Sequence, residues 1–278
     1  MKRLLRCLLF LLFAGFVFAS DGGVISDYTR QKIDEFVTER IKLKSADEET
    51  ALNSIEQIKN ETLSHLKENA LDYEQEECIL QSIYFTEFYE HALNSKGNQK
   101  NLRDKMKKQM ERNIKLIEKR SQNKISAWMY LVTGDVTSYY MTRSLTATFL
   151  YGFKVKSFYE KSIEQDKSFS SGYVNLGNWL FYAPGIFGGG KDKALKNYKK
   201  GIKYAVNPGE QYLAFIAYSQ INYENKKKDV ALEYLEKARA LNLGSKGIDL
   251  IQRCNEKGYS NFQYLRNRSG IDDELEEE

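Results

Sequence analysis

The stretch that comes closest to a known ligand-binding pattern is a glycine-rich segment in the second half of the chain. Gly185, four further residues, Gly190 and Lys191 have the spacing of a phosphate-binding loop. Asp192 then stands where that loop needs a serine or threonine, and its negative charge would oppose the phosphates. The preceding residues, LGNWLFY, predict a helix, whereas a phosphate-binding loop follows a strand. We therefore expect Pro184 to end a helix, Asp192 to lie in the first turn of the next, and no nucleotide site.

Residue types that carry hydrolytic or metal chemistry are scarce. His65 and His91 are the only histidines, and no serine- or cysteine-bearing turn accompanies either, so we expect both at the surface or at a helix boundary. The sequence predicts no enzyme, no metal site and no cofactor. Cys78 and Cys254 lie in apolar helical segments at opposite ends of the expected helical stack, and we predict two buried free thiols.

The first 19 residues have the order of charges and apolar residues that is typical of a secretory signal peptide. Lys2, Arg3 and Arg6 precede an apolar run at residues 8–18, and Ala19 follows as a small residue at a cleavage position. The run is too short for a membrane span, which needs about 20 residues. We predict cleavage after Ala19 and an exported protein, periplasmic or extracellular, with no stable membrane span after signal cleavage.

Composition restricts the remaining chain to a globular protein of balanced charge. Of 278 residues, 42% are hydrophobic and only 2 are proline, which disfavours a disordered or loop-rich chain. Without the three basic residues of the signal segment, 39 basic residues stand against 38 acidic ones, a net charge of +1. The 11 basic residues between Lys96 and Lys124 are interleaved with acids and are interpreted as a solvated helix face. We expect no nucleic-acid partner.

Apolar residues recur at helical spacing along the whole chain, so the predicted fold class is all-α. A start signal at Ser45 and Glu48 divides an N-terminal helical pair within residues 20–72. Repeated helical hairpins are expected over residues 73–243. A capping helix from Gly244 to Leu265, followed by a solvated acidic tail, completes the chain to residue 278.

The hairpin segment repeats a pattern of small and aromatic residues. Matching positions occur in Tyr173-x2-Leu176-Gly177, Val155-x3-Tyr159-x2-Ser162, Ala194-x3-Tyr198-x2-Gly201 and Ala231-x3-Leu235-x2-Ala238, with Trp128 and Leu131 as an earlier first-helix pair before a long insert. Small residues let paired helices approach closely, and large ones fill the groove between units. Across roughly residues 75–243 the sequence resembles the tetratricopeptide repeat family, in the form of an exported bacterial protein. The resemblance implies a helical-hairpin solenoid that acts as a non-catalytic protein- or peptide-binding scaffold in the periplasm.

Candidate binding residues follow from this resemblance, because first helices of successive units line the concave surface of such solenoids. The matching positions are Val174, Asn178 and Phe181 in one unit and Ile216, Gln220 and Tyr223 in the next. Amides would bond the backbone of a bound peptide, and apolar groups would cover its side chains. Val174 and Ile216, and also the two rings, are alternatively core between units. Asn178 and Gln220 have less reason to be buried.

A second resemblance is to the T component associated with tripartite solute transporters. It rests on the Ala183–Asp192 insert and on the helical lead-in before Ala127-Trp128. This resemblance implies an accessory component of a solute transporter, with a solute-binding or transporter protein as its partner. In that alternative, a small and partly apolar ligand would lie in a cavity lined by Trp128, Trp179 and Tyr182.

Overall fold

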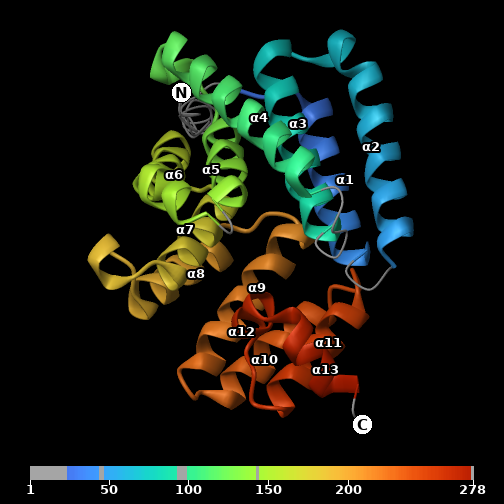
Figure 1. The fold of residues 1–278 in the computed structure, drawn as a ribbon, viewed down its shortest axis with the longest axis vertical. Coiled ribbons are helices and arrows are strands. Elements are labelled where there is room, and N and C mark those ends of the chain that lie inside the picture. Colours follow the sequence, from blue (N-terminus) through green and yellow to red (C-terminus); the bar gives the residue numbers. More distant parts are fainter. Residues whose placement is uncertain (1–23, 44–46, 93–98, 142–143, 277–278) are drawn as a thin grey trace, which may run out of the picture.

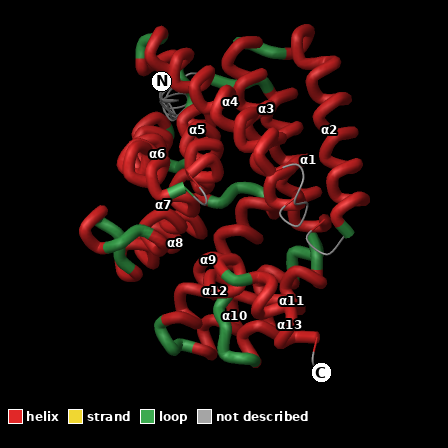
Figure 2. The backbone as a smooth tube through the Cα atoms, viewed as in Figure 1, coloured by secondary structure: helices red, strands yellow, loops and turns green. Residues whose placement is uncertain are grey.

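A computed structural model of the chain describes residues 24–43, 47–92, 99–141 and 144–276. All regular structure in these residues is helical, without a strand, and short loops join the helices (Figure 2). The prediction of an all-α fold is therefore confirmed. None of the described helices combines the length and apolar character needed to cross a bilayer. The predicted signal peptide lies outside the described residues.

Three consecutive helical hairpins form the middle of the molecule. They are α5 (Ala127–Met141) with α6 (Leu145–Gln165), α7 (Ser170–Tyr182) with α8 (Lys191–Tyr204), and α9 (Pro208–Glu224) with α10 (Lys228–Arg239). The two helices of each hairpin pack together, and the first helix of each hairpin also packs against the first helix of the next (Figure 1). The result is a helical-hairpin solenoid-like stack.

Glycine sets the close approach of the helices in the first two hairpins. A Cβ atom on Gly177 would lie 2.5 Å from the ring of Tyr198, and one on Gly134 would lie 2.6 Å from the ring of Tyr159. No side chain fits at either position without a shift of the tyrosine, so the paired helices pack this closely only because both residues are glycine. Gly134 is therefore the structural counterpart of Gly177.

This equivalence corrects the repeat register expected for α5. Trp128 and Leu131, matched to the first-helix pattern, would make Val132 the counterpart of Gly177, two residues before the observed Gly134. Trp128 instead packs edge-on against Phe169, at a centroid distance of 4.9 Å. The long insert expected between Trp128 and Val155 consists largely of regular helix, because α5 continues to Met141 and α6 begins at Leu145.

Four helices precede the three hairpins. They are α1 (Asp27–Leu43), α2 (Glu48–Asn69), α3 (Tyr73–His91) and α4 (Gln99–Lys119), and a short 3₁₀ turn, η2 (Gln122–Lys124), leads into α5. Asp47 caps the N-terminus of α2, because its side chain accepts a hydrogen bond from the Thr50 amide. The predicted cap, Ser45, lies outside the described residues. Both α3 and α4 pack against α5, so they continue the stack in the N-terminal direction.

The helix α1 also reaches the third hairpin. Its residues Val37 and Ile41 join Tyr212 and Ile216 of α9 in one apolar cluster. A Cβ on Gly209, at the start of α9, would lie 3.0 Å from the Val37 side chain, so the two helices are in close contact there. The first helix thus links the N-terminal part of the stack to its C-terminal part.

Three helices follow the hairpins where one capping helix and a solvated tail were expected. They are α11 (Ser245–Glu256), α12 (Asn261–Arg266) and α13 (Arg268–Glu276), grouped beside α9 and α10 (Figure 1). Gly258, at φ 95°, ends α11, and Ser260 opens α12 with a capping box. Ile271 is only 3% exposed, so α13 packs into the fold just before the acidic run at residues 272–278.

The glycine-rich segment forms a tight turn between α7 and α8, as the sequence predicts. It contains the 3₁₀ turn η3 (Gly185–Phe187), and the Gly190 amide donates a hydrogen bond to the Leu180 carbonyl at 2.8 Å. Asp192 lies in the first turn of α8, as expected. Cys78 and Cys254 are both buried and both free, which confirms the prediction of two unbridged thiols.

Candidate functional site

The predicted peptide-binding residues lie on one side of α7 and α9, and we call this side, defined by Asn178, Phe181, Gln220 and Tyr223, the inner face. It is covered by residues 255–266 of the same chain, which we call the C-terminal segment. The fully buried Gln220 accepts a hydrogen bond through Oε1 from the Asn261 amide at 2.8 Å. The Tyr223 hydroxyl donates to the Asn255 carbonyl at 2.6 Å. Two predicted residues therefore bind polypeptide backbone within the chain itself.

Phe262 of the C-terminal segment lies next to these hydrogen bonds and is surrounded by the rings of Phe181, Tyr182 and Tyr198, which we call the aromatic cage. Phe262 is 4% exposed and stacks on Phe181 at a centroid distance of 4.1 Å. The ring of Tyr198 lies 6.4 Å away and nearly parallel, and the Tyr182 hydroxyl donates to the Phe262 carbonyl at 3.4 Å. Such stacked rings contribute roughly 0.5–1.5 kcal/mol beyond the area they bury. The cage thus fixes one phenylalanine and its backbone together.

The other predicted residues of the inner face have structural partners. Asn178 accepts through Oδ1 from the Tyr198 hydroxyl at 2.9 Å. Ile216 is 8% exposed within the apolar cluster shared with α1, and Val174 is 6% exposed, which supports the reading of these aliphatic residues as core. The expectation that Gln220 has little reason to be buried is wrong, because α12 supplies a backbone donor for its amide oxygen.

The three aromatic residues of the predicted ligand cavity are not brought together. Trp128 contacts Phe169 just before α7 begins, whereas Trp179 and Tyr182 lie in the last turn of that helix. A helix of 13 residues is about 20 Å long, so the two groups stand at opposite ends of it. Tyr182 packs edge-on beside Phe262 of the C-terminal segment. These residues do not define one pocket.

A polar cluster that the sequence analysis did not single out lies between α1, α3, α5 and α7. Asp135 accepts through Oδ1 from the Tyr159 hydroxyl and from Asn175 Nδ2, each at 2.8 Å. Burial raises the pKa of Asp135 to about 6, against the opposing effects of Tyr159, Arg40 and Asn175. The sequence signal for this cluster is that Asp135 follows the buried Leu131 by four residues, on the same face of α5.

An ion pair adjoins this cluster and ties α1 to α3. Arg40 Nε donates to Glu87 Oε1 at 2.6 Å, and the Glu87 side chain is only 2% exposed. The second carboxylate oxygen, Glu87 Oε2, is buried without a hydrogen-bond partner. Burial raises the pKa of Glu87, and the Arg40 charge opposes that shift. A charge buried in this way is retained in the fold through its partner on the neighbouring helix.

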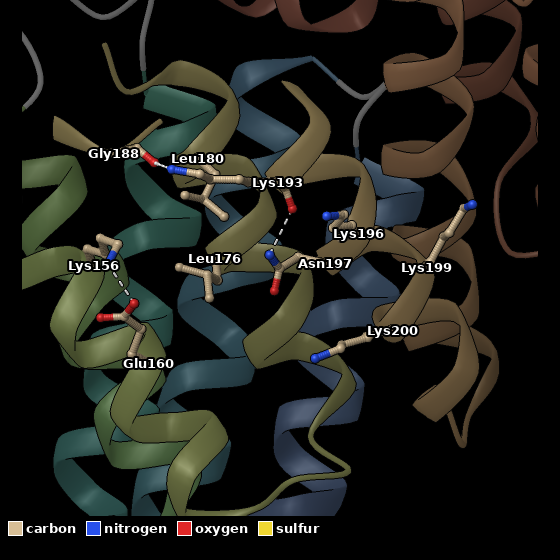
Figure 3. Close-up of a pocket in the computed structure, with 10 residues that line it drawn as sticks. All are labelled: Lys156, Glu160, Leu176, Leu180, Gly188, Lys193, Lys196, Asn197, Lys199 and Lys200. Atoms are coloured by element: carbon tan, nitrogen blue, oxygen red, sulfur yellow. Dashed lines mark hydrogen bonds and ion pairs between the residues drawn. The ribbon is translucent and has the colours of Figure 1, made fainter. Parts of the chain in front are cut away.

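A pocket of about 570 Å³ opens between α6 and α8, and we call it the outer pocket. Its lining residues are Lys156, Glu160, Leu176, Leu180, Gly188, Lys193, Lys196, Asn197, Lys199 and Lys200. Figure 3 shows Lys156 and Glu160 of α6 facing the lysines of α8, with Leu176 between them. Lys156 pairs with Glu160 at 2.6 Å, and Lys193 donates to the Gly188 carbonyl at 3.0 Å. Apolar residues from α7 and a basic rim thus share one opening.

The described side chains offer groups for binding more clearly than groups for catalysis. His65 is exposed and His91 is half-buried, so both take the surface or boundary positions expected for them. Within the described residues, no group of three histidine, cysteine or carboxylate side chains is placed to share a metal ion. What the structure does assemble is amides and hydroxyls on polypeptide backbone, an aromatic cage, and a lysine-rimmed pocket.

Comparison with models of known protein families gives no match, and comparison with curated proteins gives none either. The class of this protein therefore rests on its own geometry. It is an all-α protein of consecutive helical hairpins, whose inner face holds its C-terminal segment and whose outer face carries a basic pocket.

Proposed function

We propose that this chain is a tetratricopeptide-like repeat protein that binds polypeptide without catalysing a reaction. The observation that carries the proposal is the set of contacts between the inner face and the C-terminal segment. Gln220, Tyr223 and Tyr182 each bond a backbone atom of that segment, and Phe181 stacks on the buried ring of Phe262. Backbone bonding with a pocket for a single side chain is the general chemistry of peptide recognition.

In this proposal the C-terminal segment is the resident occupant of a groove that a partner peptide also fits. Ser260 reinforces the docking, because its hydroxyl donates to Glu224 Oε1 at 2.5 Å. A partner would compete with residues of the same chain at a high effective concentration, so only a peptide that offers an aromatic ring and free backbone groups binds measurably.

The signal-like order of the amino-terminal residues supports the part of the proposal that concerns location, an exported periplasmic or extracellular scaffold whose partner is another protein or peptide. The alternative of a transporter accessory with a small, partly apolar ligand needs Trp128, Trp179 and Tyr182 around one cavity. Trp128 packs at the start of α7 and the other two residues lie at its end, so the structure gives that alternative no support.

The test uses a fluorescent peptide that copies residues 255–266, added to the purified protein. Asn261→Pro removes the amide that bonds Gln220, and proline is tolerated at this first position of α12. Loss of the bond leaves a buried acceptor unpaired, which costs about 1–3 kcal/mol and loosens the segment. We expect the variant to bind the peptide about tenfold or more tightly than the unmodified protein, as measured by fluorescence anisotropy.

The matched control adds Gln220→Ala to Asn261→Pro. This double variant has the same loosened segment but lacks the groove amide, so its affinity for the peptide should fall below that of Asn261→Pro alone. Circular dichroism establishes that both variants keep their helical content. If folded Asn261→Pro binds the peptide no better than the unmodified protein, the inner face is a structural contact and the proposal is wrong.

A further inference from the structure

Exposed apolar side chains gather on the outer side of α6 and at the neighbouring turn. Phe149, Leu150 and Phe153 of α6 are 73%, 64% and 59% exposed, and Ile186 of η3 is 86% exposed. Positions 149, 150 and 153 share one face of a helix. Contiguous exposed apolar groups of this kind mark an interaction surface. We call these four residues the apolar ridge.

The two parts of the apolar ridge are held together by the fold. Phe153 packs edge-on against Phe187 of the turn, at a centroid distance of 5.2 Å. The turn itself is fixed to α7 by the bond from the Gly190 amide to the Leu180 carbonyl. The ridge is thus a preformed surface. Its side chains stand out into solvent, with more than half of each exposed, and do not line a cleft.

Positive charge is concentrated beside the ridge. Residues 144–160 and 183–203 together hold eight lysines, which are Lys154, Lys156, Lys191, Lys193, Lys196, Lys199, Lys200 and Lys203. Asp192 and Glu160 are the only acidic residues within these two segments, which therefore carry a net charge of +6. From outside them, Glu224 pairs with Lys191 at 2.7 Å. The remaining chain has 34 basic and 36 acidic residues, a net charge of −2. The near-balance of the whole sequence therefore conceals two strongly basic segments, and five of their lysines line the outer pocket together.

The outer pocket adjoins the apolar ridge. Gly188, two residues after Ile186 of the ridge, lines the pocket together with lysines of α8 and two leucines of α7. Of the lysines in its rim, Lys156 pairs with the carboxylate of Glu160, whereas Lys196 and Lys199 have no carboxylate partner in the described part of the chain. Protruding apolar side chains, a basic rim and leucines below the rim form one continuous surface.

We propose that this surface docks the protein onto an anionic lipid bilayer. The apolar ridge enters the boundary between headgroups and acyl chains, and the lysines of α6 and α8 contact the lipid phosphates. Interfacial binding of this kind combines buried apolar area with attraction to anionic lipids, and each basic residue near the surface contributes. A protein partner would more commonly receive such side chains in a groove of its own, whereas a bilayer accepts a protruding ridge of any outline.

The experiment places an environment-sensitive NBD label at Ile186→Cys in a Cys7→Ser background. Cys78 and Cys254 are buried, so the label attaches at position 186. We expect blue-shifted and brighter emission with vesicles of equal parts phosphatidylcholine and phosphatidylglycerol, and no change with phosphatidylcholine alone. The matched label at Leu232→Cys, on a leucine of α10 that is 51% exposed, should not respond to either vesicle.

Charge reversal tests the basic rim separately from the ridge. Lys154→Glu with Lys196→Glu should weaken vesicle binding by about thirtyfold or more, and raised salt should weaken it further. The control, Lys115→Glu with Lys246→Glu, changes the total charge equally at exposed sites away from this face. The proposal is overturned if the label at position 186 does not respond to anionic vesicles. It is also overturned if the two double reversals weaken vesicle binding to the same extent. A response to a poly-glutamate peptide but not to vesicles assigns the face to an acidic protein and also overturns it.

Discussion

Asp135 illustrates how a single side chain is shifted by its position between helices. Its carboxylate lies among α1, α3, α6 and α7, with Tyr159 and Asn175 as donors. Removal from water outweighs these donors and the nearby Arg40 charge, and the pKa of Asp135 is raised to about 6. The folded protein therefore holds this proton more tightly than the unfolded chain does, in which an aspartate has a pKa of about 3.9.

The raised pKa of Asp135 predicts a specific pH dependence of stability. Because the folded state binds the proton more tightly, the free energy of unfolding falls as the pH rises from about 4 to about 6. Asp135→Asn keeps an acceptor for Tyr159 and removes this titration. We expect the variant to match the unmodified protein near pH 4 and to be more stable by about 1–3 kcal/mol near pH 7.5. Urea unfolding at a series of pH values measures the difference.

The control for this prediction is Asp273→Asn, because Asp273 is exposed on α13. Its stability should run parallel to that of the unmodified protein over the whole pH range. A parallel course for Asp135→Asn as well would show that the fold does not perturb the Asp135 carboxyl.

At the scale of helices, the close approach within each hairpin depends on a small residue of the first helix. Gly134 and Gly177 have no room for a methyl group, while Ser219 takes the corresponding place in α9 and bonds the Ala231 carbonyl at 2.7 Å. Gly152 differs from the first two, because nothing lies within 4 Å of a Cβ built on it. Glycine is therefore required for packing at two positions and is not required at the third.

Substitution by alanine should have opposite effects at these positions. Gly177→Ala forces Tyr198 away from α7 and should destabilise the protein by about 1–3 kcal/mol. Gly152→Ala should stabilise it by about 0.5–1 kcal/mol, because alanine is the better helix former. Urea denaturation followed by circular dichroism compares the two. A loss of stability in Gly152→Ala, or none in Gly177→Ala, contradicts the packing that the structure shows.

Across the described residues, helices from the N-terminal and the C-terminal part of the chain both pack on the central hairpins. The helix α1 packs on α9, and α12 covers α7 and α9 from the other end of the sequence. Cys78 in α3 and Cys254 in α11 are both fully buried, in two different apolar clusters. Burial raises the pKa of Cys78 to about 11, so in the folded state this thiol is protected both sterically and by its ionisation.

The two thiols make the cooperativity of the fold measurable. If the contacts of α1 and α12 with the central hairpins make the fold one cooperative unit, Cys78 and Cys254 become reactive at the same urea concentration. Gly209→Val inserts a branched side chain where only 3.0 Å separates a Cβ from Val37, and it should separate the two transitions. Mass spectrometry after thiol labelling distinguishes the sites. Separate midpoints in the unmodified protein would show that the two regions unfold independently.

The inner face shows how far the sequence alone leads towards a site. Spacing along first helices identified Phe181, Gln220 and Tyr223 as residues on one surface, and the structure has all three in contact with the C-terminal segment. What covers the surface could not be predicted, because the bond from Asn261 to Gln220 joins residues 41 positions apart. Nor could the basic rim of the outer pocket, since the lysines of α6 and α8 become neighbours only when the hairpins stack.

By itself, the sequence determined the all-α class, the turn at Pro184 and the burial of both cysteines. These follow from local rules, because helical periodicity and backbone preferences act within a few residues. Only the tertiary structure decided the register of α5, the isolation of Trp128 from Tyr182, and the contact of α1 with α9. Each of these depends on which helices meet, and that choice is made by side-chain shape between segments that are distant in the chain.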